Sequence, residues 1–192
     1  MRTLLITGFE PFGGQSINPS WEAVKLLPEA VGCWQLKKLQ IPVEYGEAAR
    51  LVLDAAEQLQ PEAIISVGQA GGRAAVTPEV IGINLREASA PDNKGLLCQG
   101  EKIIPDGPDG LFSTLPVRQM VAAISEKGIP AKLSYSAGAY VCNDVLYTLL
   151  NHYAGASLRA GFIHVPYIPG QGEPNMALED IAAALTAAIE IL

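Results

Sequence analysis

The chain has 192 residues, a net charge of −7, and 49% hydrophobic against 17% charged residues. This balance excludes a disordered chain, and the acidity argues against a nucleic-acid partner, because binding a phosphate backbone needs a basic face. No apolar run reaches the roughly 18 residues of a membrane-spanning helix, and the run Leu4–Ile6 has the length of a strand rather than of a signal peptide, so we expect a soluble, cytoplasmic protein that does not bind membranes.

Short apolar runs alternate along the chain with amphipathic segments. Strands are predicted over residues 2–7, 35–43, 63–67, 79–85, 131–136 and 161–165. Helices are predicted to begin at residues 18–20 and to cover 45–59, 117–127, the segment from Cys142 to about Tyr153, and 176–192. Residues 90–108, rich in Pro, Gly, Asp and Asn, predict a long irregular excursion. The alternation predicts one α/β domain over residues 1–192, with helices on both faces of a mostly parallel sheet.

Three cysteines, Cys33, Cys98 and Cys142, lie far apart and form no CxxC pair. This sparse, odd number suits a reducing compartment and argues against a disulfide framework or a metal site. Cys142 follows a small-residue turn at 137–139 and lies near the start of a predicted helix, where the helix dipole favours a thiolate. Cys142 is therefore either a nucleophile or a buried helix cysteine of the ordinary kind.

Only two histidines could act as a base for this thiol. His152 lies ten residues beyond Cys142 on the same predicted helix, about 15 Å along the axis and too far for a hydrogen bond. His164 lies at the carboxyl end of a different strand, where sites of open α/β sheets assemble. His164 can meet Cys142 if their strands are neighbours; otherwise it is a hydrogen-bonded histidine of the core.

The group that would orient the imidazole is not decided by spacing. Asp144 follows Cys142 by two residues and so points about 200° away around the helix. Glu79, Glu87 and Asp92 remain, among 20 acidic residues in all.

Two glycine-rich loops, at 8–14 and 68–73, follow predicted strands. Neither has the dinucleotide or the P-loop pattern, so a phosphate site is not expected. Their backbone groups could instead bind a small polar ligand. Phe9 and Phe12 in the first loop either line an apolar pocket or belong to the core.

Eight motifs spread along the chain point to one family: GFEPFGG at 8–14, INPSW at 17–21, VGQAGGR at 67–73, TPE at 77–79, PDN at 91–93, FSTLPV at 112–117, SAGAYVCN at 136–143 and GFIHVPYIP at 161–169. Through them the chain resembles, nearly end to end, the pyroglutamyl peptidase I or pyrrolidone-carboxylate peptidase family. The resemblance implies a cysteine peptidase that removes an N-terminal pyroglutamyl residue from peptides. It also implies a three-layer α/β/α domain that needs no cofactor and forms a cytosolic homo-oligomer, a tetramer or a dimer.

The resemblance further implies the residues of the site. The catalytic triad falls on Cys142, His164 and Glu79. The first two agree with the spacing argument, whereas Glu79 comes from the resemblance alone. The substrate-binding residues that it implies, or that follow from the flat, half-apolar lactam ring, are Phe9, Phe12, Gln69, Gly71, Tyr140 and Val141.

Some positions depart from the family pattern. Val80 and Ser89 stand where the family often has arginines, and the segment after Pro169 is short. The altered 80–90 region motivates a second hypothesis, a non-catalytic binding protein that keeps the fold and the pocket. A nucleoside-phosphorylase-like enzyme is disfavoured, because the acidic chain lacks a basic phosphate loop.

Overall fold

The computed structural model describes residues 1–192. Its central sheet has six strands in the order β2-β3-β1-β4-β10-β5. Four strands run parallel: β1 (Arg2–Phe9), β3 (Trp34–Ile41), β4 (Ala63–Gln69) and β10 (Arg159–Val165). The edge strands β2 (Ala30–Val31) and β5 (Thr77–Pro78) are short and antiparallel to their neighbours. The predicted mixed, mostly parallel sheet is therefore confirmed.

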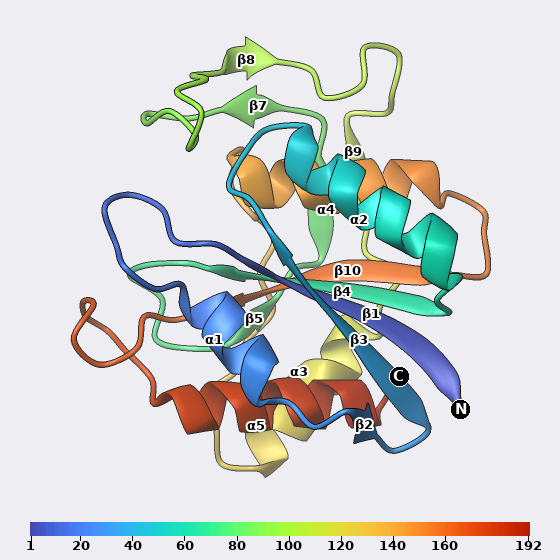
Figure 1. Cartoon of the computed structure of the whole chain (residues 1–192), viewed down its shortest axis with the longest axis vertical. Helices are drawn as coiled ribbons and strands as arrows, with labels where there is room; N and C mark the ends of the chain where they lie inside the picture. Colours follow the sequence, from blue (N-terminus) through green and yellow to red (C-terminus); the bar gives the residue numbers. More distant parts are fainter.

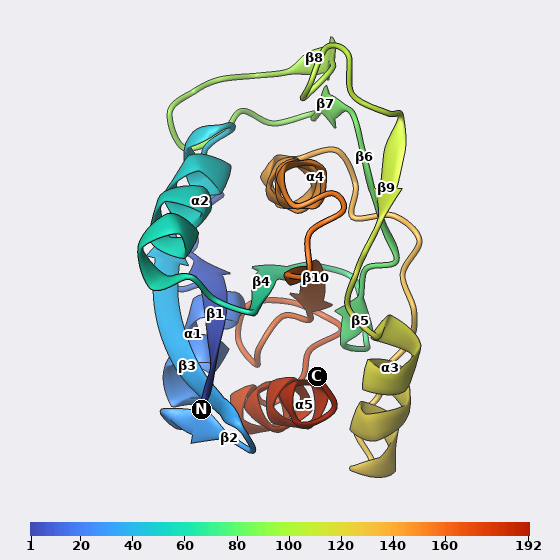
Figure 2. The ribbon, with the colours of Figure 1, turned by 90° about the vertical axis from the view of Figure 1, so that its right-hand side faces the viewer.

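Helices cover both faces of this sheet (Figures 1 and 2). One face carries α1 (Pro19–Leu26), α3 (Val117–Glu126) and α5 (Leu178–Glu190), and the other carries α2 (Glu47–Leu59) and α4 (Val141–His152). Side chains alternate between the faces along each strand: Leu4 and Ile6 join the core under α1 and α5, while Leu5 joins the core under α2 and α4. Because both of their faces are buried, β1, β4 and β10 are mainly apolar. The parallel strand β3 lies next to the edge strand and is polar and partly exposed at Gln35, Lys37 and Lys38.

Two small two-stranded antiparallel sheets lie outside the main sheet. The strand β6 (Ile81–Ile83) pairs with β9 (Gly110–Phe112), and β7 (Arg86–Glu87) pairs with β8 (Gln99–Glu101). Figure 2 shows β6 and β9 beside α4, and the β7–β8 sheet beyond it. The predicted strand 79–85 is thus shorter than expected, and Glu79 lies in the connection between β5 and β6.

The predicted strand 131–136 is wrong. This segment makes only two isolated bridges, from Ala131 to Val76 and from Ser134 to Glu79. Its neighbour β5 has two residues, one of which is Pro78 with no N–H, so a regular ladder cannot form there. The chain therefore enters α4 from an irregular segment, in which Gly138 has a φ of 76°, and not from the end of a sheet strand.

Candidate active site

Cys142 is the second residue of α4, as predicted near a helix start. Tyr140 occupies the N-cap position without a capping side-chain hydrogen bond, and the first helical bond runs from the N–H of Asp144 to the oxygen of Tyr140. The N–H groups of residues 141–143 precede that bond, so they have no helical acceptor. The half-buried thiol of Cys142 therefore lies at a helix end that presents free N–H donors.

The two residues after Cys142 hold this helix start in place. The side chain of Asn143 donates to the oxygen of Ile83 at 2.8 Å and accepts from its N–H at 2.9 Å. Asp144 accepts from the N–H of Gly46 and from Nε of Arg86, each at 2.7 Å. Both side chains are fully buried. Asp144 is thus engaged away from His164, in agreement with its exclusion by helical geometry.

Gly68 of β4 lies directly under the thiol. A Cβ atom added there would come within 2.9 Å of Cys142 Sγ and 2.7 Å of Phe162 Cζ. Gly68 also pairs in register with His164 on the adjacent strand β10. Residues paired in register point to the same face of a sheet, so the structure places the imidazole of His164 beside the thiol of Cys142.

Glu79 is hydrogen-bonded to this imidazole. Its Oε1 lies 2.7 Å from His164 Nδ1, and both side chains are buried. The backbone N–H of Glu79 donates to the oxygen of Phe162 at 2.9 Å, which fixes the residue on β10. With Nδ1–H donated to the carboxylate, Nε2 is the basic nitrogen that remains for a proton of the thiol.

Burial governs the charges of these three residues. It raises the pKa of the Cys142 thiol to about 12, aided by the charge of Glu79 and opposed by Arg73 and the thiol's own backbone N–H. Burial also lowers the pKa of His164, which Glu79 partly offsets. For Glu79, burial alone would raise the pKa, but the hydrogen bond from His164 holds it below its ordinary value. Burial thus acts against both the thiolate and the imidazolium form, in the direction opposite to that of the helix dipole at Cys142.

A cavity of about 40 Å³ opens on Cys142. Four of the predicted substrate-binding residues line it, together with two residues that were not predicted: Phe9, Phe12, Gln69 and Tyr140, with Asn18 and Val43. Tyr140 is held there by its hydroxyl, which donates to the oxygen of Pro91 at 2.9 Å. The amide oxygen Oε1 of Gln69 is buried and has no hydrogen-bond partner.

The chain is similar to known proteins over nearly its whole length. The sequence profile of the family described as pyroglutamyl peptidase matches residues 2–192. The pyrrolidone-carboxylate peptidase of Lactobacillus helveticus is 48% identical over 193 residues, which cover 97% of this chain and 96% of the relative. The crystal structure of pyroglutamyl peptidase I from Bacillus amyloliquefaciens has a TM-score of 0.95 at 42% identity and covers 99% of this chain and 96% of its own. The pyrrolidone carboxyl peptidase of Thermococcus litoralis has a TM-score of 0.94 at 37% identity, covering 100% and 93%.

The chain belongs to the pyroglutamyl peptidase family. The predictions of the family, of the α/β fold and of a hydrolase of the cysteine-peptidase class are thereby confirmed.

Two residues predicted to bind substrate do not line the cavity of this pyroglutamyl peptidase family member. Gly71 packs against Tyr167, whose Oη would lie 2.1 Å from an added Cβ. The side chain of Val141 is fully buried in the core under α2 and α4. Only its backbone N–H, at the helix start, remains as a possible contact.

A larger cavity of about 470 Å³ adjoins the first and shares Phe12 and Tyr140 with it. Ser89 and Ala90 line this second cavity, together with Glu87. Ser89, which departs from the pyroglutamyl peptidase pattern, therefore lies near the predicted substrate site and not in the triad.

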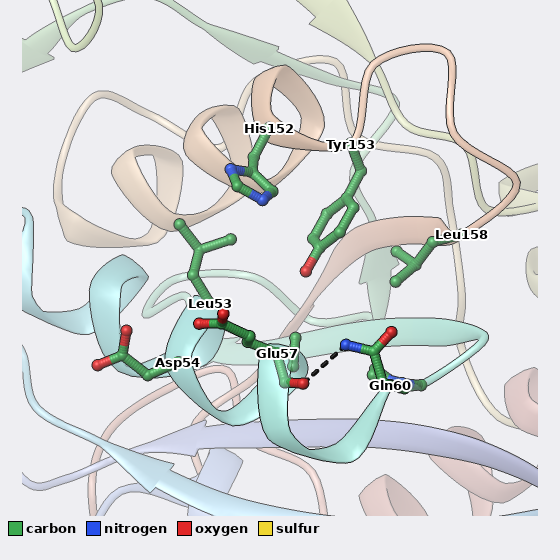
Figure 3. Close-up of a pocket in the computed structure, with 9 residues that line it drawn as sticks. Leu53, Asp54, Glu57, Gln60, His152, Tyr153 and Leu158 are labelled. Carbon is green, nitrogen blue, oxygen red and sulfur yellow. Dashed lines mark hydrogen bonds between the residues drawn. The ribbon is translucent and has the colours of Figure 1, made fainter.

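His152 lies far from Cys142, at the last residue of α4. Figure 3 shows its ring and that of Tyr153 facing a separate cavity of about 460 Å³, opposite Leu53 and Glu57 of α2. None of the residues predicted for the pyroglutamyl peptidase site lines this cavity.

Two lining residues and one charged neighbour were missed by sequence reasoning. Asn18 was interpreted only as part of a helix start, a role that it also has, because its side chain accepts from the N–H of Ser20. Val43 was placed in a strand, and it follows the end of β3. Arg73, in the VGQAGGR motif, contacts Glu79. The sequence shows Arg73 only as a cation in a glycine-rich loop, and this position alone does not indicate which residue it contacts.

Acidification should destabilise the protein through His164. Because the pKa of His164 is lowered in the folded protein, the unfolded chain binds the extra proton as the pH falls below about 6.5. The free energy of unfolding should then fall with pH, by up to about 1.4 kcal/mol per pH unit. Urea unfolding at a series of pH values between 5 and 7 (about the histidine range) measures this slope.

In the variant His164→Gln, the free energy of unfolding should lose this part of its dependence on pH. The variant His152→Gln, which changes the exposed second histidine, should keep it. An unchanged slope in His164→Gln would contradict the assignment.

Proposed function

We propose that the chain hydrolyses the bond that follows an N-terminal pyroglutamyl residue in peptides, with Cys142 as nucleophile, His164 as general base and acid, and Glu79 as the group that orients His164. One observation carries this proposal. The buried Glu79–His164 hydrogen bond of 2.7 Å lies beside a thiol at an uncapped helix start.

The chemistry follows from this arrangement. Nε2 of His164 takes the proton of the Cys142 thiol as Sγ attacks the pyroglutamyl carbonyl carbon. The oxyanion that forms accepts a hydrogen bond from the N–H of Cys142 at the start of α4. His164 then gives its proton to the leaving amine, and the C–N bond breaks to leave a thioester. Water, deprotonated by His164, hydrolyses the thioester and restores the thiol.

Glu79 keeps the imidazole in the required tautomer and stabilises its transient positive charge. Its lowered pKa means that the carboxylate is ionised at neutral pH. This role needs a buried carboxylate that stays charged, and the hydrogen bonds to Oε1 supply that condition.

The cavity suits a lactam ring. Phe9, Phe12 and Tyr140 offer apolar surface to the flat ring. The unpartnered Oε1 of Gln69 is a buried acceptor, and the ring N–H is the donor that would satisfy it. An acyclic N-terminal glutamine would instead bring a charged amine into the same cavity, where desolvation without a counter-charge is costly.

Substrate entry requires side-chain motion. At about 40 Å³ the cavity is close to the volume of one water molecule, about 30 Å³. The aromatic rings of Phe12 and Tyr140, whose centroids are 6.3 Å apart, line both this cavity and the adjoining one of about 470 Å³. We expect rotation of either ring to join the two cavities and to admit the ring of the substrate.

The test is a pair of reporter substrates that differ only in the first residue. The protein should release the reporter amine from pyroglutamyl-reporter and not from glutaminyl-reporter. Alkylation by iodoacetamide should abolish this activity, with the label on Cys142 and protection by pyroglutamate. A protein that binds pyroglutamate but releases no amine would instead be the non-catalytic binding protein.

No helix of the structure is long and apolar enough to cross a membrane. We propose a cytoplasmic homo-oligomer, supported by the resemblance and by large apolar side chains left at the surface, among them Phe112, which is 71% exposed, and Tyr135, which is 62% exposed. Sedimentation velocity giving only a monomer at micromolar concentration would contradict it.

A further inference from the structure

Arg73 shares one carboxylate oxygen with His164. Its Nη1 lies 2.7 Å from Glu79 Oε1, the same atom that receives His164 Nδ1 at 2.7 Å. The other oxygen, Oε2, is buried and has no partner. With both donors on one oxygen, the orientation of the carboxylate is fixed by Arg73 and His164 together.

The guanidinium is itself held from both sides of Glu79. Nη1 also donates to Oγ1 of Thr77 at 2.6 Å, and Nη2 donates to the oxygen of Ser136 at 2.9 Å. Thr77 belongs to the two-residue strand β5, and Ser136 to the segment that forms only isolated bridges. Backbone hydrogen bonds also join these two segments, among them those from the N–H of Lys132 to the oxygen of Val76 and from the N–H of Ser134 to the oxygen of Pro78. Arg73 adds a side-chain link between them.

The charge of Arg73 also bears on the protonation of the site. The charged or titratable groups that face Glu79 and His164 are Arg73, from the loop after β4, and Cys142, from α4. Arg73 acts to lower the pKa of both His164 and Cys142. Without this cation, the fully buried carboxylate would keep Ser134 and His164 as partners but no permanently charged one, and the Glu79–His164 pair would take up a further proton at a higher pH.

We propose that Arg73 is a positioning residue that keeps Glu79 ionised and directed at His164, so that His164 is neutral and able to accept the thiol proton. This assignment rests on the proposed function. Arg73 does not line the cavity at Cys142, so it acts through Glu79 and not on the substrate.

The site offers a matched control. The side chain of Arg73 is 26% exposed and borders a surface cavity of about 370 Å³ that Lys132 also lines. Lys132 is a second cation of the same cavity, and it makes no ion pair. Removing its charge changes the local surface without touching Glu79.

The experiment measures the pH profiles of kcat and kcat/KM for pyroglutamyl-reporter in four proteins: the wild type, Arg73→Met, Arg73→Lys and Lys132→Met. In Arg73→Met we expect kcat to fall on the order of 10- to 100-fold, KM to stay near the wild-type value, and the acidic limb of kcat/KM to move up by about one pH unit. Arg73→Lys keeps the charge and should keep the position of that limb. Lys132→Met should match the wild type.

Chemical rescue separates positioning from a role in folding. The variant Arg73→Ala opens a space toward the surface cavity, so guanidinium at millimolar concentration should restore part of kcat in a saturable way, while urea at the same concentration should not. If Arg73 only stabilised the fold, its replacement would leave the acidic limb of kcat/KM in place, and guanidinium would not restore kcat.

If Arg73→Met had the same kcat as the wild type and the same acidic limb of kcat/KM, the assignment would be overturned. Inactivity of the wild-type protein itself on pyroglutamyl-reporter would instead contradict the proposed function, so the two failures are distinguishable.

Discussion

Replacing Cys142 with alanine should lower kcat/KM for pyroglutamyl-reporter on the order of 10⁴-fold or more, because no other group in the cavity can form the acyl intermediate. Steady-state assays at enzyme concentrations high enough to see residual turnover measure the loss. The substitution removes one half-buried sulfur atom, so the thermal unfolding midpoint should change little, and loss of folding is not the cause of the inactivity.

The matched control is Cys33→Ala, since Cys33 is exposed and lies outside the site. This variant should retain wild-type kcat and KM. Release of the reporter by Cys142→Ala at the wild-type rate would show that the thiol does not perform the reaction.

Adding one methyl group at Gly68 should also impair the site, by less than the loss of the thiol. In Gly68→Ala the new Cβ would lie 2.9 Å from Cys142 Sγ and 2.7 Å from Phe162 Cζ, so both groups must shift. Overpacking of this kind costs about 1–3 kcal/mol of stability. A displacement of about 1 Å at a reacting atom can cost on the order of 100-fold in rate. Urea unfolding and kcat measured on the same preparation give both numbers.

The variant Gly161→Ala separates the loss of stability from the loss of activity. A Cβ at Gly161 would lie 2.4 Å from Ser113 Oγ and 2.5 Å from Leu115 Cδ1, away from the thiol. It should destabilise the protein by a similar amount while keeping kcat. If Gly68→Ala lost no more activity than Gly161→Ala, the close contact between Gly68 and the thiol would have no catalytic importance.

Much of the fold could be predicted from local patterns. The runs at 2–7, 63–67 and 161–165 are mainly apolar because β1, β4 and β10 are largely buried on both faces of the sheet. The helix α2 has its buried residues at helical spacing, among them Ala48, Val52 and Ala56. In these elements the local pattern and the burial agree, so the pattern predicts them.

Other features depend on partners distant in the sequence. The alternation of residues 131–136 resembles a strand, but its only neighbour is an edge strand too short to form a ladder. Glu79 lies 85 residues from His164 in sequence, and their contact depends on the antiparallel register that sets Pro78 opposite Ile163. No local spacing encodes that register, so the choice of Glu79 among many carboxylates came from the family resemblance.

The position of β10 has a consequence for how the protein becomes active. It carries His164, its Phe162 oxygen binds the N–H of Glu79, and it is the sheet neighbour of β5. During synthesis, residues 159–165 emerge after every other strand of the sheet. Until they insert between β4 and β5, the carboxylate and the thiol are present without a base. Catalytic competence is therefore among the last properties that the nascent chain acquires, and the regain of activity on refolding reports completion of the sheet.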